Sequence, residues 1–120
     1  MFFDKFTIAF LAIGVASVNA FTGTAFLQGQ DNFEICPNTC PRTSLGFVGV
    51  APDKIAEGRA RCCAVVSIAY EGKNVFGMIL GTCPSCARSD NITLSANLFQ
   101  QVGVDPTSVK EISPVVWNVL

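Results

Sequence analysis

The sequence contains no histidine, a single tryptophan and a single tyrosine, and only 14% of its 120 residues are charged. Without histidine, three kinds of site are excluded: a histidine general base, a Ser-His or Cys-His nucleophile pair, and a zinc site with a histidine ligand. The net charge is −1 and the charges are scattered, which argues against nucleic acid and anionic membrane surfaces as partners. Since 50% of the residues are hydrophobic, the composition is that of one folded domain rather than a disordered segment.

An apolar run near the N-terminus has the features of a secretory leader. Residues 6–18 contain no charge, and Val18-Asn19-Ala20 offers small or medium side chains at the two positions that a signal peptidase inspects. We therefore expect cleavage after Ala20, giving a signal peptide over residues 1–20 and a secreted, extracellular domain over residues 21–120. A buried N-terminal helix or a membrane anchor is the alternative, although the run is shorter than the roughly 20 residues that span a bilayer.

All six cysteines follow this leader, and an even number in a short secreted chain predicts three disulfides. They are Cys36, Cys40, Cys62, Cys63, Cys83 and Cys86. If Cys62 and Cys63 open a strand, their side chains point to opposite faces and bond to different partners. A bond between them is the rare, strained alternative, and excluding it still leaves most of the 15 pairings of six cysteines open.

The Cys83-Pro84-Ser85-Cys86 segment also has the spacing of a redox motif or of half a zinc site. The secreted context and the lack of a thioredoxin-like βαβ pattern argue against both. We therefore expect no metal and no cofactor.

Short stretches rich in β-forming residues alternate with turns along the rest of the chain. Strands are expected at residues 22–27, 45–51, 64–70, 74–80, 92–94, 109–112 and 115–119. Glu71-Gly72-Lys73 forms a hairpin turn between two of them, and Pro114 marks a break before the last. Residues 28–44 form a loop tied down by cysteines, residues 52–57 one helical turn, and Ser95 is the N-cap of a helix that ends near Gly103. This pattern predicts a small, mainly β barrel of about six strands with one or two short helices.

Several segments together resemble the rare lipoprotein A-like double-psi β-barrel family, which includes barwin, the first domain of expansins and many single-domain secreted fungal proteins. The matching segments are residues 64–75 (AVVSIAYEGKNV), 81–86 (GTCPSC), 91–99 (NITLSANLF) and 115–117 (VVW), with a looser match at residues 23–26 and 48–51. The resemblance covers nearly all of the chain after the leader and is specific between Cys62 and Phe99. It implies a six-stranded double-psi β-barrel.

Departures from the family pattern bear on catalysis. Catalytic relatives place an Asp at the end of the strand before the C-P-x-C loop, and many carry a second Asp in the strand that enters the helix. Here these positions hold Gly81 and Thr93. Glycoside cleavage needs a carboxylic acid to protonate the leaving oxygen, usually with a second carboxylate beside it, so we expect no enzymatic activity. The nearest acid, Asp90, is interpreted as a solvated turn residue.

The resemblance also implies a ligand groove. Its candidate residues are Phe26, Leu27, Tyr70, Gly81, Asp90 and Thr93. Phe26 stands where relatives usually have Tyr, and Leu27 stands where a second aromatic side chain is common. Most aromatic side chains are expected in the core. A groove with these apolar exchanges would suit a protein segment or an apolar ligand at least as well as a sugar chain.

Asn91-Ile92-Thr93 is a glycosylation sequon, which makes Asn91 a candidate glycosylation site in a secreted chain. A glycan there would stand at or near the mouth of the groove. It would hinder the binding of a long polysaccharide.

Two functions from different classes fit these observations. The first is an expansin-like, non-hydrolytic module that binds cell-wall polysaccharide. The second is a secreted interaction protein, such as an effector or a protease inhibitor, that binds a host or other secreted protein through its loops. Loops on a disulfide-tied scaffold suit this role because they are ordered before association, and residues 28–44 are the obvious candidate. In either case we expect a monomer that stays free of the membrane once the signal peptide is removed.

Overall fold

The computed structural model describes residues 20–29, 33–37 and 39–120. The predicted signal peptide, apart from Ala20, lies outside the described residues. In the described part of the chain, no helix is long and apolar enough to cross a membrane.

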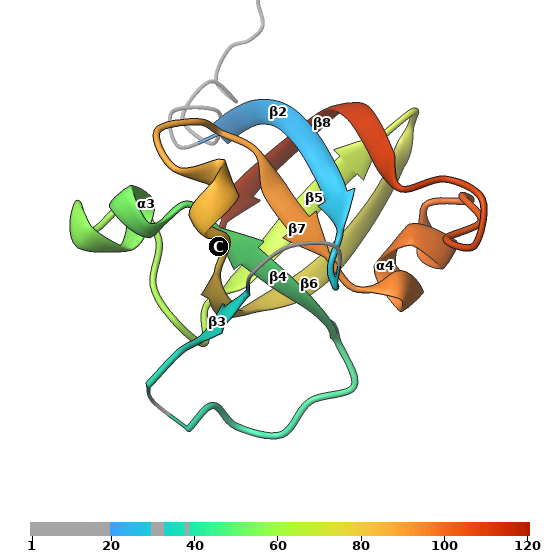
Figure 1. Cartoon of the computed structure of the whole chain (residues 1–120). Coiled ribbons are helices and arrows are strands. Elements are labelled where there is room, and N and C mark those ends of the chain that lie inside the picture. Colours follow the sequence, from blue (N-terminus) through green and yellow to red (C-terminus); the bar gives the residue numbers. More distant parts are fainter. Residues whose placement is uncertain (1–19, 30–32, 38) are drawn as a thin grey trace, which may run out of the picture.

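Six strands close into a mixed barrel, in the order β6-β4-β7-β2-β8-β5, with β5 pairing back to β6 (Figure 1). They are β2 (Ala20–Leu27), β4 (Gly46–Val50), β5 (Val65–Tyr70), β6 (Lys73–Thr82), β7 (Ile92–Leu94) and β8 (Glu111–Val119). The β2–β7 and β4–β6 pairs are parallel. The short strand β3 (Glu34–Ile35), which lies in the predicted loop, adds to the end of β6. These strands and the two short helices α3 (Pro52–Ala56) and α4 (Ala96–Gln101) confirm the predicted double-psi β-barrel.

The hairpin between β5 and β6 forms where the sequence predicts it. Tyr70 pairs with Lys73, so the turn consists of Glu71 and Gly72, whose φ values are 47° and 82°. Two-residue hairpin turns that match the twist of the strands need this positive φ, which glycine adopts without strain.

The last strand corrects one prediction. Instead of two strands separated at Pro114, β8 runs unbroken through this residue. The register of β8 against β2 shifts between Gly23 and Ala25, opposite Pro114. Thr24, at this bulge, donates its N–H to Asn91 Oδ1 at 2.9 Å. A proline is tolerated in a strand at such a bulge because its missing N–H leaves no partner unsatisfied.

Alternating side chains of the strands fill the barrel. The fully or almost fully buried residues include Ala25, Leu27, Val48, Val50, Val66, Ile68, Ile92, Leu94, Phe99 and Trp117. The prediction that most aromatic side chains lie in the core holds only in part: among the described residues Phe99 and Trp117 belong to the core, and Phe21 and Tyr70 pack against it while partly exposed. Phe47 and Phe76 are 41% and 45% exposed, since each alternates along its strand with inward-facing neighbours.

Helix α4 follows Ser95, which occupies the N-cap position as predicted, but the Ser95 side chain makes no capping hydrogen bond to the helix backbone. Its hydroxyl instead accepts the N–H of Phe47 at 3.0 Å. This contact ties the start of α4 to β4.

Candidate functional site

Four neighbouring strands place one row of residues on the outer face of the barrel. Phe26 of β2 pairs with Thr93 of β7, Thr93 pairs with Gly49 of β4, and Gly49 pairs with Gly81 of β6. The residues on either side of Phe26, Thr93 and Gly49 belong to the core, so this outer row faces away from it. Phe26, Gly81 and Thr93, three of the predicted groove residues, are thus brought together.

The side chain of Phe33 covers the two glycines of the outer row. A Cβ atom added to Gly49 would lie 2.8 Å from Phe33 Cε1, and one added to Gly81 would lie 2.6 Å from Phe33 Cζ. The Gly81 Cβ would also lie 2.3 Å from the backbone oxygen of Glu34 in β3. Any side chain at either glycine, including the Asp that catalytic relatives have, would therefore collide with Phe33 or β3.

This cover explains why Thr93 is only 4% exposed although it faces outward. Its hydroxyl oxygen is buried and has no hydrogen-bond partner among the described residues. A Cβ on Gly49 would lie 2.4 Å from that oxygen, so the space between Thr93 and Phe33 holds no further side chain. The outer row offers neither a carboxylate nor an open floor for a sugar ring.

The other predicted groove residues lie elsewhere. Leu27 is 8% exposed and belongs to the core. Tyr70 lies at the hairpin end of β5, partly buried against the core. Burial and the adjacent Glu71 carboxylate raise the pKa of its phenol.

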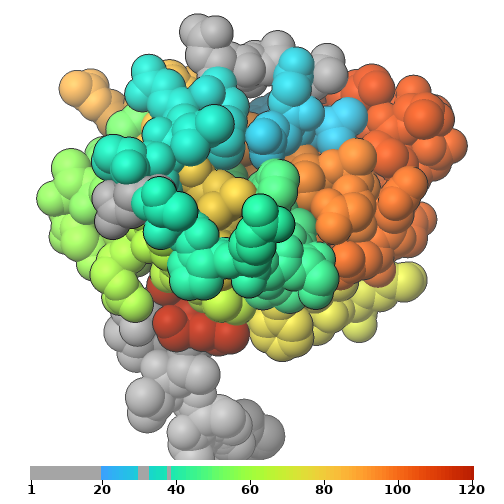
Figure 2. Space-filling model, turned by 90° about the horizontal axis from the view of Figure 1, so that it is seen from below, coloured from blue at the N-terminus to red at the C-terminus, as the bar shows by residue number. Residues whose placement is uncertain are grey.

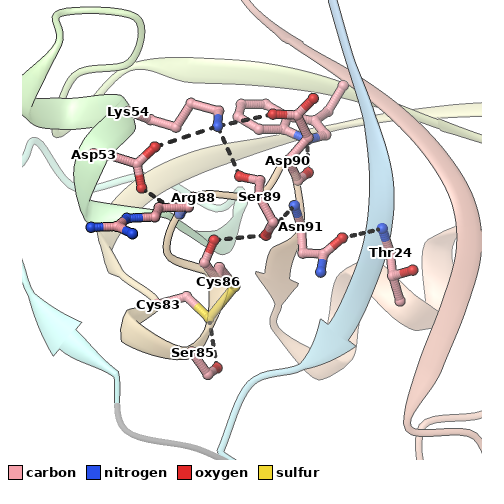
Figure 3. The surroundings of a disulfide bond; sticks show 11 residues. Thr24, Asp53, Lys54, Cys83, Ser85, Cys86, Arg88, Ser89, Asp90 and Asn91 are labelled. Carbon is pink, nitrogen blue, oxygen red and sulfur yellow. Dashed lines mark hydrogen bonds and ion pairs between the residues drawn. A yellow bond between two sulfur atoms is a disulfide. The ribbon is translucent and has the colours of Figure 1, made fainter.

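Asp90 pairs with a buried lysine of α3 (Figure 3). The Lys54 ammonium lies 2.9 Å from Asp90 Oδ1 and donates to the Ser89 backbone oxygen at 2.8 Å. Lys54 is 2% exposed, and the Asp90 side chain is 43% exposed. Asp90 is thus a turn residue with a solvent-exposed side chain, as interpreted from the sequence, and a buried cation also holds its carboxylate. Neither hydrogen bond nor ion pair joins Asp90 to the described residues of the outer row.

A second contact fastens α3 to the same turn. The backbone N–H of Arg88 donates to Asp53 Oδ1 at 2.7 Å. This hydrogen bond, with the nearby positive charges of Lys54 and Arg59, holds the pKa of Asp53 below its usual value. The charged groups around Asp90 thus form a structural clamp between α3 and the turn before β7.

The three predicted disulfides are confirmed, and they leave no free cysteine. The pairs are Cys36–Cys62, Cys40–Cys63 and Cys83–Cys86. Cys62 and Cys63 bond to different partners as predicted, but they lie in a turn before β5 rather than at the start of a strand. The Cys83–Cys86 bond closes the C-x-x-C segment on itself, with both residues at most 1% exposed (Figure 3). Among the described residues, no group of His, Cys, Asp or Glu is placed to hold a metal ion.

Two of these bonds fasten the cysteine loop, defined here as residues 36–37 and 39–45, to the turn at residues 62–63. A pocket of about 660 Å³, the loop pocket, lies between the cysteine loop and the barrel. Its apolar lining includes Phe33, Ile35, Phe47 and Leu80. Figure 2 views this face, where the teal and green cysteine loop frames a hollow with the gold chain near residue 80 inside it. A pocket of this size and lining is typical of a binding site.

Exposed apolar side chains border the loop pocket. Ile35 is 78% exposed and Phe47 is 41% exposed. Among the described lining residues, Arg42 is the only charged one. Exposed apolar groups gathered around a concavity with one charge mark an interaction surface more often than scattered apolar residues do.

Asn91, the predicted glycosylation site, is partly buried beside Thr24 of β2, opposite the bulge in β8. Its Oδ1 accepts the Thr24 N–H. Asn91 lies two residues before Thr93, which belongs both to the sequon and to the outer row. Glycosylation of Asn91 stays a prediction.

Sequence reasoning missed Gly49 and Phe33. Gly49 carried a usable signal, because a glycine inside a strand often marks the close approach of another group. Phe33 carried none, since its position depends on where the long loop folds back across the barrel.

No family model matches the chain, and a search of curated proteins finds no match. Solved structures do share its fold. A Streptomyces papain inhibitor superposes with a TM-score of 0.61 at 19% identity, over 84% of this chain and 94% of the inhibitor. An expansin of Clavibacter michiganensis is 20% identical over 84% of this chain. Its TM-score is 0.61 in the apo form and 0.59 for a mutant in complex with cellohexaose. This chain covers 50% of the expansin. The fold is the double-psi β-barrel of barwin-like and expansin-like proteins, as the sequence resemblance implied.

Proposed function

We propose that this double-psi β-barrel is a secreted, non-catalytic binding module that recognises a partner protein through the cysteine loop and the loop pocket. The observation that carries the proposal is the position of Phe33. Its ring lies on Gly49 and Gly81 and closes the outer row, while the loop pocket stays open beside it. Binding would therefore take place on the loop side of the barrel rather than along the covered row.

The residues support a role without catalysis. Gly81 and Thr93 replace the acids of catalytic relatives, and the sequence has no histidine. Asp90 is paired with Lys54. A glycosidase needs a carboxylic acid within reach of the leaving oxygen, and the outer row supplies none. Three disulfides in a 120-residue chain support secretion, because such bonds persist in oxidising compartments.

The cysteine loop suits protein recognition because it is anchored before any partner arrives. Two disulfides hold it to one turn, and pre-ordering lowers the entropy lost on association. The inhibitor among the similar structures acts on a protease by its name. A protease is therefore the first class of protein to test as a partner.

The proposal is tested by titrating the secreted protein against soluble proteases, namely papain, trypsin, subtilisin and pepsin. We expect binding to at least one, weakened about tenfold or more by Phe47→Ser, since truncating an apolar contact at the centre of an interface costs about 1.4 kcal/mol or more. Phe76→Ser is the matched control. Phe76 is similarly exposed but pairs with Ser67 on the β5–β6 face. Equal losses for the two variants would contradict a site at the loop pocket.

Polysaccharide binding is the second candidate function. The solved expansin complex with cellohexaose supports it, and the covered outer row argues against it. A pull-down on insoluble cellulose and chitin separates the two. Retention on either glycan, with no binding to any protease, would favour the polysaccharide.

A further inference from the structure

The cysteine loop exposes an arginine in a segment with the properties of a protease substrate. Pro41, Arg42 and Thr43 are all exposed, and no helix, strand or hydrogen-bonded turn includes them. We infer that Arg42 enters the specificity pocket of a protease that cleaves after arginine or lysine, and that the chain inhibits such proteases. The inference rests on the proposed function and narrows it to one class of partner and one residue.

The backbone of Arg42 is available to an enzyme. Neither its N–H nor its carbonyl oxygen hydrogen-bonds to any other described residue. Proteases align the segment they cleave as an extended strand, so these groups must be free to pair with the enzyme. Pro41 favours this geometry, because the residue fixes its own φ near −65° and restricts the chain around it.

The other arginines after the leader whose surroundings the structure describes are held in turns. The N–H of Arg59 donates to the Lys54 oxygen at 2.9 Å, and the Arg61 oxygen accepts the N–H of Ala64 at 3.2 Å. Arg88 has a φ of 63°, and its N–H is bound to Asp53. None of these three backbones can become an extended strand without breaking a hydrogen bond or changing a dihedral angle. Arg42 is therefore the arginine best placed for an enzyme cleft.

Charge decides the kind of protease. Arg42 is the only charged residue among the described residues that line the loop pocket, and no ion pair joins it to a described residue. A trypsin-like specificity pocket ends in a carboxylate and accepts a cationic side chain. Desolvated charge pairs across an interface are among the strongest single contacts. Phe47 and Ile35 would pack beside this contact and form the apolar centre of the interface together with it.

The segment is restrained on both sides. Cys40, two residues before Arg42, is bonded to Cys63. After it, the Thr43 hydroxyl accepts the N–H of Leu45 at 3.1 Å, and β4 begins at Gly46. An inhibitor differs from a substrate chiefly in this restraint, because a pre-ordered segment binds tightly and leaves slowly.

The disulfides also determine the fate of a cleaved chain. Hydrolysis of the Arg42–Thr43 peptide bond would break its C–N bond and add one water, leaving a carboxylate on Arg42 and an amine on Thr43. Cys36 and Cys40 lie before this bond, while their partners Cys62 and Cys63 lie after it. Both fragments therefore stay covalently joined, and the N-terminal fragment keeps its strand pairing through β2 and β3. The two new ends cannot diffuse apart as the products of an ordinary substrate do.

The test is inhibition of trypsin, measured with a chromogenic arginine substrate. We expect Arg42→Ala to weaken inhibition at least about 100-fold, as the loss of one partner of a buried charge pair does. Arg42→Lys should stay within about tenfold, because the pocket still meets a cation. Arg42→Leu should no longer inhibit trypsin and should instead inhibit chymotrypsin, whose specificity pocket is a hydrophobic slot. Arg59→Ala, which removes a 46% exposed arginine outside the loop, should leave inhibition unchanged.

Electrophoresis after long incubation with trypsin gives a second readout. We expect any nicked protein to run intact without reductant and as two fragments with it. Unchanged inhibition by Arg42→Ala, or fast cleavage after Arg42 without inhibition, would overturn the inference. If papain or subtilisin binds in a Phe47-dependent way while trypsin is not inhibited, the inference fails and the proposed function stands. If none of the proteases binds, both fail.

Discussion

The packing of Phe33 on Gly49 predicts a strong coupling between these two positions. In Gly49→Ala, the new methyl group would lie 2.4 Å from Thr93 Oγ1 and 2.8 Å from Phe33 Cε1. Both distances are far below an ordinary contact between such atoms, which is about 3.5–4.0 Å for carbon. The Phe33 ring must therefore move away from the barrel, and overpacking of this kind lowers the free energy of unfolding by about 1–3 kcal/mol.

Replacing Phe33 by alanine removes the obstacle together with its half-buried ring. By itself, Phe33→Ala should lower the free energy of unfolding by about 1–2 kcal/mol, since part of the ring's apolar surface is lost from contact. In that background two of the three nearest atoms to the methyl group introduced by Gly49→Ala, both from Phe33, are gone. The third, Thr93 Oγ1, has no hydrogen bond among the described residues to lose if the side chain shifts. We therefore expect the double variant to lose at least about 1 kcal/mol less than the sum of the single variants.

The assay is equilibrium unfolding in urea followed by the fluorescence of Trp117. This residue is the only tryptophan and is fully buried, so its emission reports unfolding of the barrel. In a domain of this size, 1 kcal/mol corresponds to a change of about 4–8 °C in Tm, which gives a second readout. Gly49→Ala combined with Phe76→Ala is the matched control, because Phe76 lies on the β5–β6 face and should add independently.

Additivity would refute this reasoning. If Gly49→Ala and Phe33→Ala add within about 0.5 kcal/mol, Phe33 does not lie on the outer row in solution. Gly81→Ala offers a comparison, because its methyl group would also meet the Glu34 backbone oxygen at 2.3 Å. Cys36, two residues further on, is tied to Cys62. We therefore expect a larger loss for Gly81→Ala and only partial relief from Phe33→Ala.

Three further predictions concern what holds the barrel together. Alanine replacement of the Cys40–Cys63 pair, which closes a loop of sequence separation 23, should lower the free energy of unfolding by about 3 kcal/mol in a urea titration; the Cys83–Cys86 pair, with a separation of 3, should lower it by about half as much. The Arg88 N–H keeps the pKa of Asp53 below its unfolded value, so this carboxylate contributes stability above the unfolded pKa that is lost as pH falls through the folded one. Asp53→Asn should therefore flatten the loss of stability below about pH 4. Lys54→Met keeps the buried aliphatic stem but removes the ammonium. It should lower the free energy of unfolding, measured by thermal denaturation, by about 1–3 kcal/mol.

The barrel strands were predictable because their signals are local. Runs of β-forming residues marked β5 and β6, and Glu71-Gly72-Lys73 marked the turn between them. The strand break expected at Pro114 shows the limit of such local signals. Proline interrupts most strands, but β8 continues through Pro114. Whether it does so in β8 depends on the bulge that β8 forms opposite Thr24 of β2 and on Asn91, which is distant in sequence. A local pattern cannot contain that information.

The candidate site was predictable only in part, because its cover depends on contacts between segments that are distant in sequence. The family resemblance identified Gly81 and Thr93, and the strand register places them on one face, on either side of Gly49 in β4. The cover over them depends on the disulfide pairing, which the sequence left open. Once Cys36 is bonded to Cys62, the chain just before it must cross the barrel near Gly81. The Phe33 ring then packs on the outer row at Gly49 and Gly81, which have no side chain to block it.

The same closure explains why a binding function would move from the outer row to the loop. Phe33, β3 and the Cys36–Cys62 bond together fix the chain from Phe33 to Cys36. The Cys40–Cys63 bond and β4 then fix the two ends of the segment that carries Arg42. A segment this short, held at both ends, loses little conformational entropy when a partner binds it. The contacts that cover the outer row therefore also help to order the proposed inhibitory segment. A variant that releases Phe33, such as Phe33→Ala, should weaken protease binding even though every residue of that segment is unchanged.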